Sequence, residues 1–257
     1  GTAVNVGGSG TYEVGADDTV GSIAGSGAIN LGDQSLTVGG DNSSTEFSGV
    51  VSGTGGLAKQ GTGTLTLSGS NSYSGPTSVT QGTLRVANTE ALGSSSSFSL
   101  DNGTLSFAVS PLGEGSGSLV LGGNGGVLDV DVDQSLSLSG VVSGTGSLTK
   151  TGGGQLSLSG DNTYTGQTVI SDGALSVGGS LSDVTDVFIG DGSIYELGSS
   201  DRVGSIAGGG SIVLNTFRLT AGNELDTTFS GVMSGDGGFT KVGSGLLTFT
   251  GDNTYTG

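Results

Sequence analysis

The sequence contains no cysteine, no histidine and no tryptophan, and it has only two prolines. Without histidine or cysteine the chain cannot assemble a Ser/His/Asp triad, a thiol nucleophile, a Cys/His zinc site or a disulfide framework. An enzyme built from this chain would have to use carboxylates, hydroxyls and six cationic side chains.

Positive charge is scarce, because 6 Lys and Arg stand against 23 Asp and Glu, for a formal net charge of −17. Binding to nucleic acid requires clustered cations and usually stacking aromatic rings. We therefore expect no nucleic-acid partner. No apolar run approaches the roughly 18 residues that a membrane helix needs, so we also expect no membrane insertion of this segment.

Glycine is abundant, with 56 residues in 257. Each glycine inside a helix costs about 1 kcal/mol relative to alanine, so this density disfavours helices almost everywhere. The composition therefore argues against a helical fold, and it is the strand pattern of the repeats that predicts an all-β fold.

Three copies of one block organise the chain. They begin at Ser48, Ser139 and Ser230, 91 residues apart, with no insertion inside the shared part. The copies occupy residues 48–86, 139–177 and 230–257, and the third is cut short in mid-unit. We therefore interpret residues 1–257 as a single repetitive fragment of a longer protein.

Within a block, apolar residues alternate with small polar ones, as in Leu65-Thr66-Leu67 and Leu84-Arg85-Val86. Period 2 over a few residues, bounded by Gly, Asn and Ser, indicates short strands with one buried face. The connections are too short for crossover helices, which favours a solenoid of about 20 to 25 residues per coil. About eleven coils would stack into a rod roughly 50 Å long at ~4.8 Å per strand.

Rare residue types recur at the same spacing of 91 residues. We interpret the three lysines as strand-edge residues on the outer face, and the repeated Asn-Ser/Thr-Tyr segment as a corner. In that corner the asparagine would adopt a left-handed backbone conformation and the tyrosine would pack over a coil edge. Pro76 replaces Gln167 of the second copy, and a proline there requires a corner or an unpaired amide. The recurring residues are Lys59, Lys150 and Lys241; Asn71, Asn162 and Asn253; and Tyr73, Tyr164 and Tyr255.

The block closely resembles the passenger-associated transport repeat of bacterial autotransporters. It reads LAKQGTGTLTLSGSNSYSGPTSVTQGTLRV from Leu57, LTKTGGGQLSLSGDNTYTGQTVISDGALSV from Leu148, and FTKVGSGLLTFTGDNTYTG from Phe239. The resemblance implies a right-handed parallel β-helix in the passenger of a Gram-negative surface or secreted protein. It also implies an outer-membrane barrel further along the parent chain, and it carries over no catalytic residue.

The most site-like cluster is Asp129, Asp131 and Asp133, which alternation would place on one face about 7 Å apart. Carboxylate oxygens suit a hard cation such as Ca²⁺. However, the EF-hand pattern fails, since Gln134 and Gly140 stand at its sixth and twelfth positions. We expect a solvated acidic face and keep a weak cation site as the alternative.

Paired carboxylates can also serve enzymes that cleave polysaccharides. The local mixture of acids with a cation is Asp183, Asp186, Asp191 and Arg202. Sugar sites usually need stacking aromatics, which are few here. We therefore expect no enzymatic activity, no catalytic residue and no cofactor.

The sequence thus predicts a non-enzymatic β-helical stalk of an autotransporter passenger that promotes export and presents adhesive or effector regions at the cell surface. Its expected partner is the barrel of its own parent chain. An adhesive or self-associating surface on this segment, binding the host cell or another copy, is the alternative. A β-helix enzyme acting on polysaccharides is a weaker one.

Overall fold

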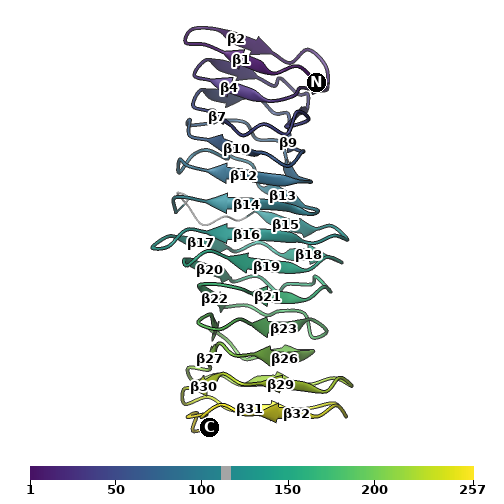
Figure 1. Ribbon diagram of the computed structural model, residues 1–257, viewed down its shortest axis with the longest axis vertical. Coiled ribbons are helices and arrows are strands. Elements are labelled where there is room, and N and C mark those ends of the chain that lie inside the picture. The colour runs from purple at the N-terminus through teal and green to yellow at the C-terminus, as the bar shows by residue number, and fades with distance from the viewer. Residues whose placement is uncertain (111–116) are drawn as a thin grey trace.

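The computed structural model describes residues 1–110 and 117–257, and in these residues the chain forms a stack of short parallel strands. Figure 1 shows the coils following one another from the N-terminal end of the stack to the C-terminal end. The predicted all-β parallel solenoid is confirmed. No helix long and apolar enough to cross a membrane occurs among the described residues.

Each coil visits three faces in the same order. Face one is a continuous parallel sheet of thirteen strands among the described residues. Its strands are β1 (Val4–Val6), β4 (Ile23–Gly25), β7 (Thr45–Phe47), β10 (Thr64–Leu67), β12 (Gly82–Val86), β14 (Gly103–Phe107), β16 (Gly126–Val130), β19 (Leu148–Thr151), β21 (Thr168–Ile170), β23 (Asp186–Ile189), β26 (Ser205–Gly208), β29 (Thr227–Phe229) and β32 (Leu247–Phe249).

Faces two and three are each interrupted. Face two holds β2 (Thr11–Glu13), β5 (Ala28–Asn30) and β8 (Val50–Ser52), and then β17 (Ser135–Leu138), β20 (Gln155–Leu158), β22 (Ala174–Val177), β24 (Ile194–Leu197), β27 (Ser211–Val213) and β30 (Val232–Ser234). Face three holds β3 (Asp18–Thr19), β6 (Leu36–Val38), β9 (Leu57–Lys59), β11 (Thr77–Val79), β13 (Ser97–Leu100), β15 (Ser118–Leu121) and β18 (Val142–Gly144), and then β25 (Asp201–Val203), β28 (Leu219–Ala221) and β31 (Phe239–Lys241).

The register on face one gives the length of each coil. Leu65 lies beside Leu84, Leu84 beside Leu105 and Leu105 beside Leu128, so these coils hold 19, 21 and 23 residues. The whole stack makes about twelve turns, one more than expected, because several coils are shorter than 20 residues. Twelve strand spacings of ~4.8 Å make the rod about 58 Å long.

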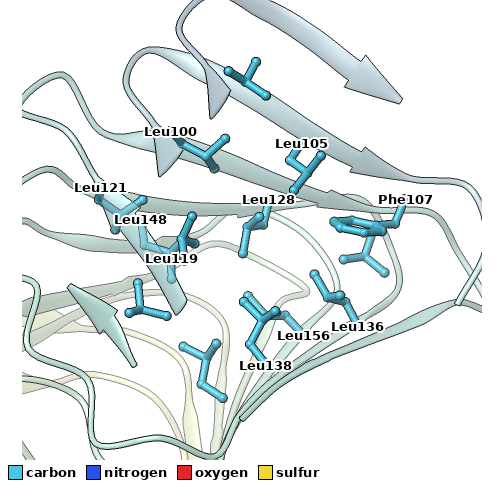
Figure 2. Packing of buried hydrophobic residues seen from close by; sticks show 14 of the residues in the cluster. Leu100, Leu105, Phe107, Leu119, Leu121, Leu128, Leu136, Leu138, Leu148 and Leu156 are labelled. Carbon is cyan, nitrogen blue, oxygen red and sulfur yellow. The ribbon is translucent and has the colours of Figure 1, made fainter. Parts of the chain in front are cut away.

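The interior is a narrow column of apolar side chains. Every second residue of a strand points inward, and the inward residues of successive coils stack on one another. Figure 2 shows this packing around Leu105, Leu128, Leu136 and Leu156. The strand β20 illustrates the alternation, since Leu156 and Leu158 are fully buried while Gln155 and Ser157 face outward.

The three copies of the repeat do not lie on the same faces. The strand with the lysine lies on face three in the first and third copies (β9 and β31) but on face one in the second (β19). From Ser48 to Leu138 the chain completes four coils and one further face, and from Ser139 to Phe229 it completes four coils and two further faces. One sequence motif is therefore compatible with two rotational positions about the rod axis.

Candidate functional site

The lysines of the first two copies are buried, which contradicts their assignment to the outer face. Lys59 and Lys150 are about 1% and 0% exposed. The alternation Leu-x-Lys points the lysine inward with the leucine, and the stem packs in the column while the ammonium reaches the corner. Lys241 in the third copy is exposed. Its ammonium donates to the carbonyls of Val242 and Gly243.

Each buried ammonium holds two turns together. Lys150 Nζ donates to the carbonyls of Thr151 at 2.7 Å, Gly152 at 2.6 Å and Asp172 at 3.3 Å. The first two carbonyls belong to its own coil and the third to the next coil. Lys59 makes the same three contacts with Gln60, Gly61 and Gln81. We call these arrangements the lysine clamps.

The backbone conformation in each lysine clamp requires a glycine. Gly61 and Gly152 have φ values of +67° and +72°, which turn their carbonyls toward the ammonium. An added Cβ would also lie 1.9 Å from the Gly39 carbonyl oxygen at Gly61, or 2.2 Å from the Val130 oxygen at Gly152. Desolvation lowers the pKa of both Lys59 and Lys150, and the carbonyl oxygens replace the lost water.

The Asn-Ser/Thr-Tyr segment replaces a strand instead of forming an outer corner. In the first copy it occupies face two, where the Asn71 side chain accepts from the Val51 amide at 2.7 Å and donates to the Ala91 carbonyl at 2.6 Å. In the second copy it occupies face three, and Asn162 bonds the Val142 amide and the Ser180 carbonyl. The asparagine thus continues the backbone ladder through three coils.

Two sequence-based expectations for this segment are wrong. Asn71, Asn162 and Asn253 are absent from the residues with positive φ. The tyrosines do not lie over a coil edge, because Tyr73 and Tyr164 are fully buried and their hydroxyls pair with Thr77 and Thr168. Burial raises the pKa of Tyr73 to about 12.

Pro76 is accommodated as expected in the first copy, because the missing amide has no acceptor there. In the second copy the Gln167 amide donates to the Ser147 hydroxyl at 3.1 Å. In the first copy these positions are Pro76 and Gly56, which lack the donor and the acceptor together. Pro76 packs against Gly56 there.

Asp201 is a buried carboxylate that the sequence did not single out. It is 5% exposed and accepts from the Leu181 amide at 3.2 Å, the Arg202 amide at 2.9 Å and the Tyr195 hydroxyl at 2.7 Å. It accepts from the amide 20 residues earlier, as Asn71 and Asn162 do. Burial raises the pKa of Asp201 to about 6, and the charge of Asp183 adds to the effect.

The acidic cluster is only partly on one face. β16 ends at Val130, and Asp133 lies in the following turn with φ of +63°, so it does not continue the alternation. Asp131 forms an ion pair with Arg85. Asp129 accepts from Ser106 at 2.8 Å and from Thr151 at 3.0 Å. Arg85 therefore already supplies positive charge to this face. The solvated acidic face, with a weak cation site as its alternative, stays a prediction.

The other acids are not gathered into one site. Asp183 and Arg202 form an exposed pair at 3.6 Å. Asp186 on β23 accepts from Ser205 and Asn223, and Asp191 lies in the turn at the far end of the same strand. Among the described residues no group of three or more acidic side chains is placed to hold a metal ion.

The lysine clamp predicts a specific loss of stability. We expect Lys150→Met to lower the free energy of unfolding by about 2–4 kcal/mol, because three part-buried carbonyls lose a charged donor. Lys241→Met, at the exposed lysine, should cost clearly less. Chemical denaturation of both variants measures the difference, and equal stability of the Lys150→Met variant and the unsubstituted protein would refute the clamp.

Asp201 predicts a pH dependence. The folded protein holds this proton more tightly than the unfolded chain, whose carboxyl pKa is near 3.8. Protonation therefore contributes stability that is fully present below the unfolded pKa and is lost as the pH rises through about 6. Asp201→Asn should raise the melting temperature by at least about 3 °C at neutral pH and have less effect at acidic pH. Asp133→Asn in an exposed turn is the control, and an equal effect at both pH values would contradict the assignment.

Comparison with known proteins finds matches to the repeat blocks of this chain. The passenger-associated-transport-repeat family matches residues 57–86, 148–177 and 239–257. An adhesin autotransporter named BmaC, from Brucella suis biovar 1 (strain 1330), is 34% identical over 272 residues. That alignment covers 95% of this chain and 8% of the Brucella protein. No solved structure matches significantly.

The matched segments coincide with the lysine clamps and the buried asparagine and tyrosine. Each match begins at the strand that carries the lysine, and the first two end at the strand that follows the next clamped turn. The segments that match the family therefore contain the residues that bond one coil to the next. The chain therefore carries three segments that match passenger-associated-transport repeats, and over most of its length it is similar to a small part of an autotransporter adhesin.

Proposed function

We propose that this segment is a non-enzymatic, rod-shaped stalk of a surface-displayed or secreted passenger in a Gram-negative bacterium. The single observation that carries the proposal is the unbroken sheet of face one, which runs from β1 to β32 through the described residues. Residues 1–257 would then act as one solenoid that holds other parts of the parent protein away from the membrane. The partner of the stalk is the outer-membrane barrel of the parent chain.

The stack also supports a role in export. Each coil pairs with the coil before and the coil after it, so folding can begin at one end and propagate along the rod. Coils that fold outside the outer membrane would oppose return of the chain through the pore. The lack of cysteine suits this route, because no disulfide must be broken before the chain crosses the pore.

An adhesive role is the second candidate, and the name of the Brucella relative favours it. In that case an outer surface of this segment would bind the host cell or another copy of the chain. The two roles make different demands, since the stalk needs an intact stack and adhesion needs particular outward side chains.

The export role can be tested in the full-length parent with three variants. Deletion of residues 48–229 removes nine whole coils and rejoins face one to face two, so a shorter rod should still be displayed. Leu158→Asp buries an unpaired charge in the column and should reduce display several-fold. Ser157→Asp, the outward neighbour on β20, is the matched control and should be displayed normally.

Display is measured by protease accessibility of the passenger on intact cells, normalised to the barrel in the outer membrane. Limited proteolysis of the purified segment shows separately whether Leu158→Asp has unfolded the neighbouring coils. Normal display of a passenger with unfolded coils would rule out the export role. Loss of host-cell binding in variants with normal display would favour adhesion.

A further inference from the structure

Two arginines differ from the other cations of the chain. Lys59, Lys150 and Lys241 donate to backbone carbonyls, and Arg85 is paired with Asp131. Arg202 and Arg218 instead present their guanidinium groups to solvent on face three. Arg202 has the exposed Asp183 at 3.6 Å, and Arg218 donates to the Thr240 hydroxyl at 2.9 Å. Among the described residues, no carboxylate lies within 4.0 Å of Arg218.

Both arginines line one hollow. The strands β25 and β28 are neighbours, and Arg202 lies opposite Thr220. The Arg218 amide donates to the Ser200 hydroxyl at 3.1 Å. Strand spacing and rise place the two arginine Cα atoms about 8 Å apart on this surface. The hollow measures about 430 Å³ and is lined by Ser180, Asp183, Ser200, Asp201, Arg202, Arg218 and Thr220.

The local fold explains why a hollow forms at this place. Residues 178–185 belong to face three but contain no strand, so β25 begins a new sheet there. The Leu181 amide bonds the Asp201 side chain instead of a strand backbone. The Asp201 carboxylate therefore forms a fixed polar floor beneath the two arginines.

The chemistry of the lining selects a class of ligand. Arg202 faces Asp183 on the preceding coil and Arg218 faces Thr240 on the following coil, so the two guanidinium groups do not converge on one group. The Arg218 guanidinium suits a ligand carboxylate, which arginine binds through paired hydrogen bonds. The remaining lining groups are hydroxyls and carboxylates, which pair with ligand hydroxyls. The lining contains no apolar residue, whereas a peptide site normally offers an apolar pocket for an anchor side chain. A hydroxylated ligand that carries a carboxylate fits this surface.

We propose that the hollow binds an acidic saccharide, with the carboxylate of a uronic acid on Arg218 and its ring hydroxyls on Arg202, Ser180, Ser200 and Thr220. The site does not depend on the export role, because it lies on the outer surface of a folded coil. The site would let the outer surface of face three bind a ligand.

The test uses the folded 257-residue chain, with D-glucuronate as the probe and NMR chemical-shift titration at low salt as the readout. Shifts should concentrate at residues 180–183, 200–202 and 218–220. D-Glucose, which lacks the carboxylate, should produce no saturable shift. Arg218→Gln should weaken glucuronate binding by about tenfold or more, since it removes the charge-assisted hydrogen bonds to the carboxylate, and Arg202→Gln should weaken it less.

Arg85→Gln, which alters an arginine on face one, is the matched control and should leave the glucuronate titration unchanged. Retained amide spectra show that each variant is folded. Glucuronate binding that survives both arginine substitutions, or no saturable shift with the unsubstituted chain, would overturn the site. N-Acetyl-aspartate that binds as tightly as glucuronate would overturn its assignment to a saccharide.

Discussion

Every coil of this rod must pair its backbone with the coil on either side. A strand does this by itself, but turns and strandless segments leave amides and carbonyls that are cut off from water and costly to leave unpaired. In this structure, side chains form the hydrogen bonds that a strand backbone would otherwise make. Asn71 and Asn162 bridge an amide and a carbonyl of the adjacent coils, and the lysine clamps gather carbonyls of two successive turns.

Because the motif bonds only to neighbouring coils, its second copy can occupy a different rotational position about the rod axis. The motif contacts only its own coil and the two beside it, so nothing in those contacts fixes which of the three faces it occupies. The intervening coils set the rotational position through their lengths, which vary between 19 and 23 residues on face one. A repeat that is constant at 91 residues therefore need not be constant in space. The outer surface differs from copy to copy even where the sequence is similar.

The fold was largely predictable from sequence, because strand alternation and the exact spacing of the copies both report on local structure. The buried lysine was predictable in part. The alternation that places Leu148 inside also places Lys150 inside, but a charged side chain is buried only when partners satisfy it. Those partners include the carbonyl of Asp172, which lies on the next coil and cannot be inferred from the motif. The role of Asp201 was hidden for a similar reason, since its partner Leu181 lies on the preceding coil and its partner Tyr195 lies on another face of its own coil.

Every contact described above depends on the stacking of neighbouring coils. Engineered cysteine pairs test this stacking most directly, because the chain has no cysteine of its own. Ser157 on β20 and Ser176 on β22 are register partners on the outside of face two. Their expected Cα separation of ~4.8 Å suits a disulfide. Val169 is nearer to Ser157 in sequence but lies on face one. Mild oxidation of the folded chain should therefore cross-link Ser157→Cys with Ser176→Cys efficiently and leave Ser157→Cys with Val169→Cys as free thiols. The reverse result would contradict the stacking of coils described above.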